Sequence, residues 1–165
     1  MKKWSERPKE IANLMNPAFC SLVITSSAMG YYEYNSSKIC YPLILISLSL
    51  ILNNNTRWKL PRTIRTSLPL WIQSNLSDTI GLLDMTEDIK QIVNEAIIWG
   101  HTHDLFSFNP GGLIQPKSDF KRLTKSIPKS NKYIIEFVNQ SYLLGKWLAK
   151  SGSPNTVMQL WRISL

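Results

Sequence analysis

The chain has 165 residues, a formal net charge of +8 and a hydrophobic content of 44%. This length suits one domain with its own core, and this composition excludes a disordered or low-complexity protein. The positive charge favours an anionic partner, either nucleic acid, an acidic protein surface or a membrane face, although a basic balance also serves solubility alone.

The sequence favours a cytoplasmic location and gives no sign of a membrane anchor. Residues 1–7 are polar and no apolar signal segment follows them. The longest apolar run, residues 39–52, is shorter than the roughly 20 residues that a bilayer requires. Cys20 and Cys40 both lie in apolar surroundings, as expected for free thiols in a reducing compartment.

The first half of the chain reads as a series of helices. After a frayed N-terminus (residues 1–7), turn and capping residues predict helices over residues 8–15 and 17–31. The helix predicted over residues 42–52 is apolar on all sides, so we expect it to be central and buried. Residues 62–74 are expected to form a further helix, kinked at Pro69.

The second half adds a hairpin to these helices. Thr86, followed by Glu87 and Asp88, predicts the start of an amphipathic helix that ends at Gly100. Residues 105–116 have the turn chemistry of a β-hairpin. A basic linker (residues 117–131) then leads to C-terminal helices within residues 132–165, over 132–150 and 156–163. The prediction is one mainly α domain, residues 1–165, with a hairpin and a winged-helix-like order of elements.

No pattern in the sequence predicts catalysis, and we expect a protein that is not an enzyme and needs no cofactor. The segment His101-Thr102-His103-Asp104 lacks the ligand spacing of a zinc site, so dipole compensation at a helix end explains it better. The acids at 84, 87, 88 and 95 fit helix capping and a solvated face. Neither a Gly-x-Ser-x-Gly elbow nor a phosphate-binding Gly-rich loop is present.

Two cationic segments are the candidate binding residues. The first follows the apolar run and contains no acid; its cations are Arg57, Lys59, Arg62 and Arg65. Arginine forks match phosphate or carboxylate geometry, and Trp58 is a candidate interface anchor, although a solvated basic loop is an equally good interpretation. The second lies in the predicted linker, where the candidate nucleic-acid or acidic-partner contacts are Lys121, Arg122 and Lys125.

The order of several segments resembles the middle component of bacterial three-component ABC systems, including Lamassu-type anti-phage defence. The segments are Arg7-Pro8, Asn16-Pro17-Ala18-Phe19, the 43–52 helix, Leu60-Pro61, Arg65-Thr66-Ser67-Leu68 and Trp71-Ile72. The 89–100 helix and the 105–116 hairpin continue the resemblance, which covers residues 7–116.

This resemblance implies a non-catalytic adaptor subunit of an anti-phage or anti-plasmid defence complex. Its partners would be an SMC-like ABC ATPase that senses DNA and an effector, often a nuclease, with DNA reached directly or through the complex. The alternative is a stand-alone winged-helix DNA-binding regulator, with residues 156–163 as the second helix of a helix-turn-helix. An adaptor should co-purify with a large ATPase, whereas a regulator should bind duplex DNA by itself.

Overall fold

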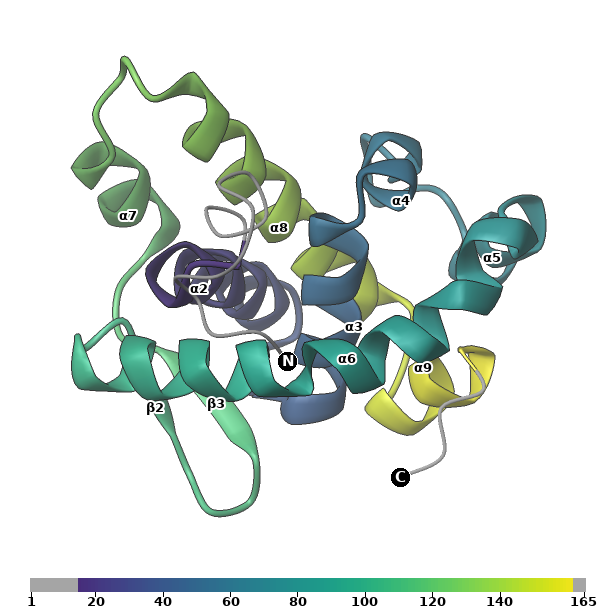
Figure 1. Ribbon diagram of the computed structural model, residues 1–165, viewed down its shortest axis with the longest axis horizontal. Coiled ribbons are helices and arrows are strands. Elements are labelled where there is room, and N and C mark those ends of the chain that lie inside the picture. Colours follow the sequence, from purple (N-terminus) through teal and green to yellow (C-terminus); the bar gives the residue numbers. More distant parts are fainter. Residues whose placement is uncertain (1–14, 162–165) are drawn as a thin grey trace.

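The computed structural model describes the backbone of residues 15–161 and, outside residues 80–88, their side chains as well. The N-terminus predicted to be frayed (residues 1–7) and nearly all of the helix predicted over residues 8–15 therefore lie outside the described residues. The described helices in the first half are α2 (Pro17–Asn35), α3 (Tyr41–Leu52), α4 (Asn54–Lys59), α5 (Leu68–Ser74) and α6 (Leu76–Thr102). Those in the second half are α7 (Phe120–Ser126), α8 (Lys132–Lys150) and α9 (Pro154–Leu160) (Figure 1).

The expected mainly helical fold with a hairpin is confirmed, and a third short strand joins the hairpin. Strands β2 (Phe106–Phe108) and β3 (Leu113–Pro116) form the predicted antiparallel hairpin. Strand β1 (Ile39–Cys40) pairs with the other edge of β3, which gives the strand order β1-β3-β2. The first two residues of the long apolar run therefore form an edge strand of this sheet before α3 begins. No helix in the described part of the chain is long and apolar enough to cross a membrane.

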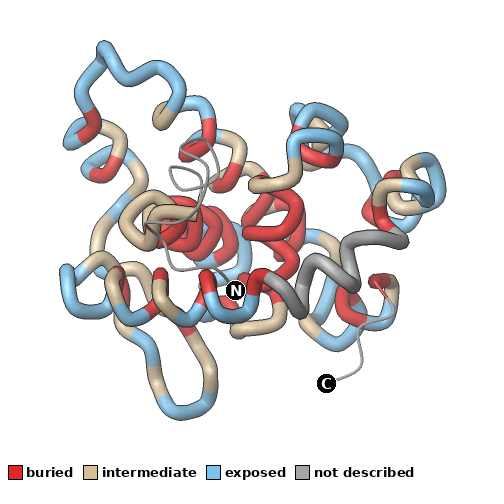
Figure 2. Tube along the Cα trace, viewed as in Figure 1, coloured by how far each residue is buried: buried red, intermediate tan, exposed pale blue. Residues whose placement is uncertain are grey.

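Helix α3 is enclosed as its apolar sequence predicts. Every residue from Leu43 to Ile51 is buried, and Leu48 has no accessible surface (Figure 2). Helices α2, α6, α8 and α9 all contact it. Pro42 lies at the first turn, where its missing N–H costs nothing because those donors have no partner within a helix.

Helix α2 is the second central element, and small residues bring it against α8. Its described buried face includes Ser26, Ser27 and Gly30, which have little side-chain volume. A Cβ placed on Gly30 would lie 2.0 Å from the carbonyl oxygen of Tyr142, and one on Gly145 would lie 2.0 Å from the carbonyl oxygen of Ser27. The two backbones therefore touch directly at both glycines, which requires residues without a Cβ.

Several predicted boundaries were wrong or incomplete: α2 continues past residue 31 to Asn35, α6 continues past Gly100 to Thr102, and α9 begins at Pro154. Helix α6 begins at Leu76, so the signal at Thr86 falls inside a helix that the preceding helix-forming residues have already begun. Residues 62–67 are not helical, because α5 starts with Pro69 at its first turn. The segment expected as a linker contains α7, whose start is capped by the side chain of Asp119, an acceptor from the Arg122 N–H at 2.8 Å.

Candidate functional site

Three asparagines, residues 53–55, turn the chain from α3 into α4. The Asn53 side chain caps α4 by accepting hydrogen bonds from the N–H groups of Asn55 at 2.9 Å and Thr56 at 3.4 Å. The buried Thr56 hydroxyl donates to the carbonyl of Leu50 at 2.8 Å, which satisfies a carbonyl near the end of α3. These bonds fix α4 on the end of the central helix, so Arg57 and Trp58 are held in defined positions.

Arg57 is a buried cation that has no carboxylate partner among the residues whose side chains are described. Its side chain is only 9% exposed, and its guanidinium carbon lies 4.0 Å from the centre of the Phe137 ring. Nη2 donates to Asn54 Oδ1 at 2.7 Å, whereas the buried Nε has no hydrogen-bond partner among the described residues. A buried donor left unpaired costs about 1–3 kcal/mol, so the packing around Arg57 has to offset this cost.

The other three cations of the first basic segment have different surroundings. Lys59 forms an ion pair with Asp78 at 2.6 Å, while Arg62 and Arg65 are exposed. Trp58, beside Arg57, is 65% exposed. The structure thus separates the predicted contacts into one buried arginine, one paired lysine and two exposed arginines. That they contact a partner or DNA stays a prediction.

Two tryptophans hold the non-helical segment that carries Arg62 and Arg65. The Nε1–H of Trp71 donates to the carbonyl of Lys59 at 2.7 Å, and that of Trp147 donates to the carbonyl of Thr66 at 2.7 Å. The two indole rings also pack edge to face, with their centres 5.5 Å apart. Because both ends of the segment are tied to the core, its path along α8 is fixed.

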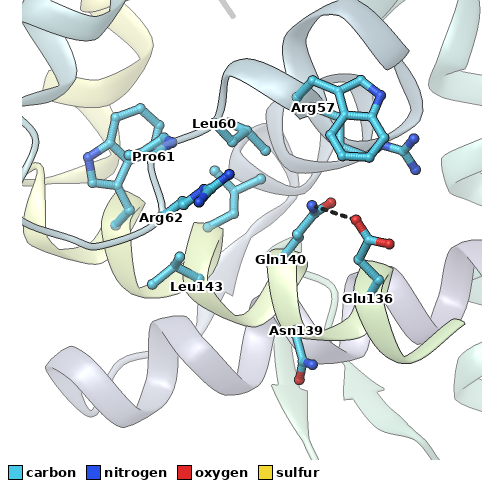
Figure 3. Close-up of a pocket in the computed structure, with 11 residues that line it drawn as sticks. Arg57, Leu60, Pro61, Arg62, Glu136, Asn139, Gln140 and Leu143 are labelled. Atoms are coloured by element: carbon cyan, nitrogen blue, oxygen red, sulfur yellow. Dashed lines mark hydrogen bonds between the residues drawn. The ribbon is translucent and has the colours of Figure 1, made fainter. Parts of the chain in front are cut away.

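A pocket of about 320 Å³ lies between this segment and α8. Figure 3 shows side chains of α4 and the following residues facing those of α8 across it. On the α8 side, Gln140 Nε2 donates to Glu136 Oε1 at 3.3 Å, while the buried Gln140 Oε1 has no partner. The residues that line the pocket are Arg57, Trp58, Leu60, Pro61, Arg62, Glu136, Asn139, Gln140, Leu143, Leu144 and Trp147.

The α8 half of this pocket could not be foreseen from the sequence. Glu136 and Gln140 read there as the ordinary polar face of an amphipathic helix. Only the fold places them in the same pocket as Arg57, which lies about eighty positions earlier in the chain. Arg57, buried against the Phe137 ring, distinguishes this region from a solvated helix face.

The second cationic group lies elsewhere on the molecule. Lys121, Arg122 and Lys125 are all exposed on α7. Figure 1 shows α7 and α4 on opposite sides of α8, so the two cationic groups lie on separate elements that do not adjoin in the fold. Leu123 and Ile127 anchor α7 against α2 and α8 in a small separate hydrophobic cluster.

The histidine segment has a structural explanation. The His103 ring stacks on Trp99 with their centres 3.7 Å apart, and its Nδ1 lies 2.8 Å from the Trp99 carbonyl oxygen. The carboxylate of Asp104 pairs with Lys117 at 2.5 Å, which lowers the pKa of Asp104. Within the part of the chain with described side chains, no group of three His, Cys, Asp or Glu residues could hold a metal ion.

A family model matches residues 4–165 of the chain. The family is described as ABC-three component (ABC-3C) system Middle Component 3. Neither the curated proteins nor the solved structures include a significant match to this chain.

Proposed function

Because the chain belongs to the Middle Component 3 family of ABC-three component systems, we propose that it is a non-catalytic adaptor subunit. In this proposal it joins an SMC-like ABC ATPase, which senses DNA, to an effector, often a nuclease, in the cytoplasm. The assembly would act in anti-phage or anti-plasmid defence of the Lamassu type. The observation that carries the proposal is the family match, which spans nearly the whole chain.

The surface of the described residues supports a protein that works through contacts. Large apolar side chains are exposed in several places, including Leu70 at 62%, Ile98 at 67% and Tyr133 at 53%. Aromatic and aliphatic side chains of this size act as anchors when a partner covers them. Their separation over α5, α6 and α8 suits a subunit with more than one neighbour.

DNA contact, if this chain makes it directly, is assigned in our proposal to the exposed cations of α7.

The alternative of a winged-helix regulator gains no support from α9, its expected recognition helix. The described helix has the sequence Pro-Asn-Thr-Val-Met-Gln-Leu and buries Val157 and Met158, while Arg162 of the predicted 156–163 range lies outside the described residues. A helix that packs its apolar face on the core is poorly placed to enter a DNA groove.

The test is co-expression of the tagged chain with the products of its neighbouring reading frames. We expect an ATPase subunit and an effector to co-elute with it in size-exclusion chromatography. Elution of this chain alone, with its neighbours present at equal amounts, would contradict the adaptor role. For DNA, K121E combined with K125E should weaken binding of the complex at low salt and matter less as salt rises.

A further inference from the structure

We propose that this chain binds the phosphate backbone of a nucleic-acid duplex directly, through a basic patch on α7, the loop that follows it and the first residue of α8. The patch is defined by five exposed cations, Lys121, Arg122, Lys125, Lys129 and Lys132. This inference rests on the proposed function, in which the complex senses DNA, and it names the surface and the ligand chemistry of one contact within it.

The fold holds the cations of α7 on the outside of a packed element. Leu123 is buried in the small hydrophobic cluster with α2 and α8, and the Phe120 ring stacks on Tyr142 with 3.8 Å between their centres. Lys121 and Lys125 are four residues apart, so they lie on the same side of the helix. Figure 2 shows that α7 and the loop leading to α8 are largely exposed. The patch is therefore fixed relative to the core and open to a large ligand.

The acids around the patch leave it positively charged. None of its five cations forms an ion pair with a carboxylate among the residues whose side chains are described. Asp119 caps the start of α7, and Glu136 lines the pocket on the α4 side of α8. Glu33 accepts hydrogen bonds from Lys146 Nζ at 2.6 Å and from the Tyr142 hydroxyl. A surface with this surplus of cations attracts a polyanion.

The composition of the patch favours nucleic acid over an acidic protein segment. Four of the five cations are lysines, and lysine is depleted at protein interfaces, where arginine and aromatic residues are enriched. The large apolar side chains that are exposed among the described residues lie on other elements, and the nearest in sequence, Tyr133, packs its ring against Phe137. A protein partner would find no buried anchor here, whereas phosphate contacts alone support sequence-independent binding to nucleic acid.

A duplex suits the patch better than a single strand does. Single strands are held largely by bases that stack on exposed aromatic rings, and neither α7 nor the loop after it exposes a large aromatic side chain. Lysine ammonium groups act as point charges on phosphate and carry no sequence information. DNA and RNA duplexes share this backbone chemistry, so the experiment compares the two.

The experiment measures binding of the purified full chain to a labelled DNA duplex, an RNA duplex and a DNA single strand of the same sequence, by fluorescence anisotropy at several salt concentrations. We expect a duplex to bind more tightly than the single strand. The logarithm of the association constant should fall with the logarithm of the salt concentration with a slope of up to about −4.5, because each phosphate contact contributes about −0.9. Tighter binding of the single strand than of either duplex would overturn the proposal.

Two double variants test the two parts of the patch. K121Q combined with K125Q changes α7, and K129Q combined with K132Q changes the loop and the start of α8. Each should raise Kd for the duplex at least tenfold at low salt and make the salt slope shallower by about 2. R62Q combined with R65Q is the matched control, because it removes the same charge from two exposed arginines between α4 and α5. The control should change Kd less than twofold, and an equal loss in the control would show an effect of net charge and overturn the patch.

Co-expression separates this inference from the adaptor role. Melting curves establish that each variant is folded, and both patch variants should recover the partner subunits as the wild type does. Loss of a partner subunit from K121Q combined with K125Q would assign the patch to a protein contact and overturn the proposal. Absence of duplex binding by the wild-type chain, with its complex still assembled, would overturn the patch and leave the adaptor role intact. Failure of the wild-type complex to assemble would instead overturn the adaptor role.

Discussion

The direct contact between α2 and α8 predicts that G145A will destabilise the protein strongly. The added Cβ would lie 2.0 Å from the carbonyl oxygen of Ser27 and 2.9 Å from the backbone nitrogen of Tyr31. Ordinary contact begins at 3.4 Å, which is 1.4 Å further from the Ser27 oxygen and 0.5 Å further from the Tyr31 nitrogen, and both atoms belong to the backbone of a buried helix. A side-chain rotation therefore cannot relieve the clash, and α8 has to move.

Two opposing effects determine the size of the change. Alanine favours a helix over glycine by about 1 kcal/mol, which would stabilise α8. Overpacking of a tight core costs typically about 1–3 kcal/mol and more where the backbone must shift. Movement of α8 would also weaken the bond from the Ser27 hydroxyl to the Ser141 carbonyl, now 3.2 Å long. We expect a net loss of about 3 kcal/mol, which lowers Tm by about 6–12 °C for a domain of this size.

Thermal unfolding followed by circular dichroism provides the assay, with G111A as the matched control. A Cβ on Gly111 would meet only the Asn109 side chain at 3.4 Å, and this exposed residue is not in the left-handed region. G111A should therefore change the free energy of unfolding by less than about 0.5 kcal/mol. A G145A protein that melts at or above the wild-type temperature would refute the backbone contact.

Three further predictions test the core and two ionisable groups. L48A should lose about 2–5 kcal/mol because it opens a cavity in α3, whereas L70A, at an exposed side chain, should melt as the wild type does. Burial raises the pKa of Cys20 to about 12 and also raises that of Cys40. Iodoacetamide at pH 8 should therefore alkylate Cys20 only after unfolding. Detection of alkylated Cys20 in the folded protein by mass spectrometry would contradict its burial. Hydrogen bonds from α8 lower the pKa of Glu33 below its usual value of 4.5, so its carboxylate stabilises the fold above that pH. E33Q should lower Tm at pH 7 by an amount equivalent to less than about 1 kcal/mol, and this difference should vanish as the pH falls through the lowered pKa.

Elements with a strong local signal could be predicted from the sequence. The apolar run correctly predicted that α3 is buried, and α8 spans residues 132–150 as its amphipathic pattern predicted. The cap helps to explain this agreement, because the Asn131 side chain accepts a hydrogen bond from the Ile134 N–H at 3.4 Å. Such signals depend on neighbouring residues alone, so they do not require knowledge of the fold.

Features that depend on distant residues could not be predicted in the same way. The close contact of α2 with α8 depends on Gly30 and Gly145, which lie more than a hundred positions apart and share no local pattern. Arg57 read as a surface cation, yet the Phe137 ring on α8 covers it. Helix α7 was missed because its many cations resemble a solvated linker, whereas the burial of Leu123 shows that it packs on the core.

The pocket and the glycine contact depend on the same helix. Gln140 precedes Gly145 by little more than one turn of α8, so any change in the distance between α2 and α8 also moves the Gln140 acceptor. Arg57, on the other wall, is carried by α4, which the Thr56 hydrogen bond holds on the end of α3. Its guanidinium carbon also lies 4.0 Å from the centre of the Phe137 ring of α8. The position of Arg57 relative to α8 is therefore set by core packing and not by flexible surface side chains.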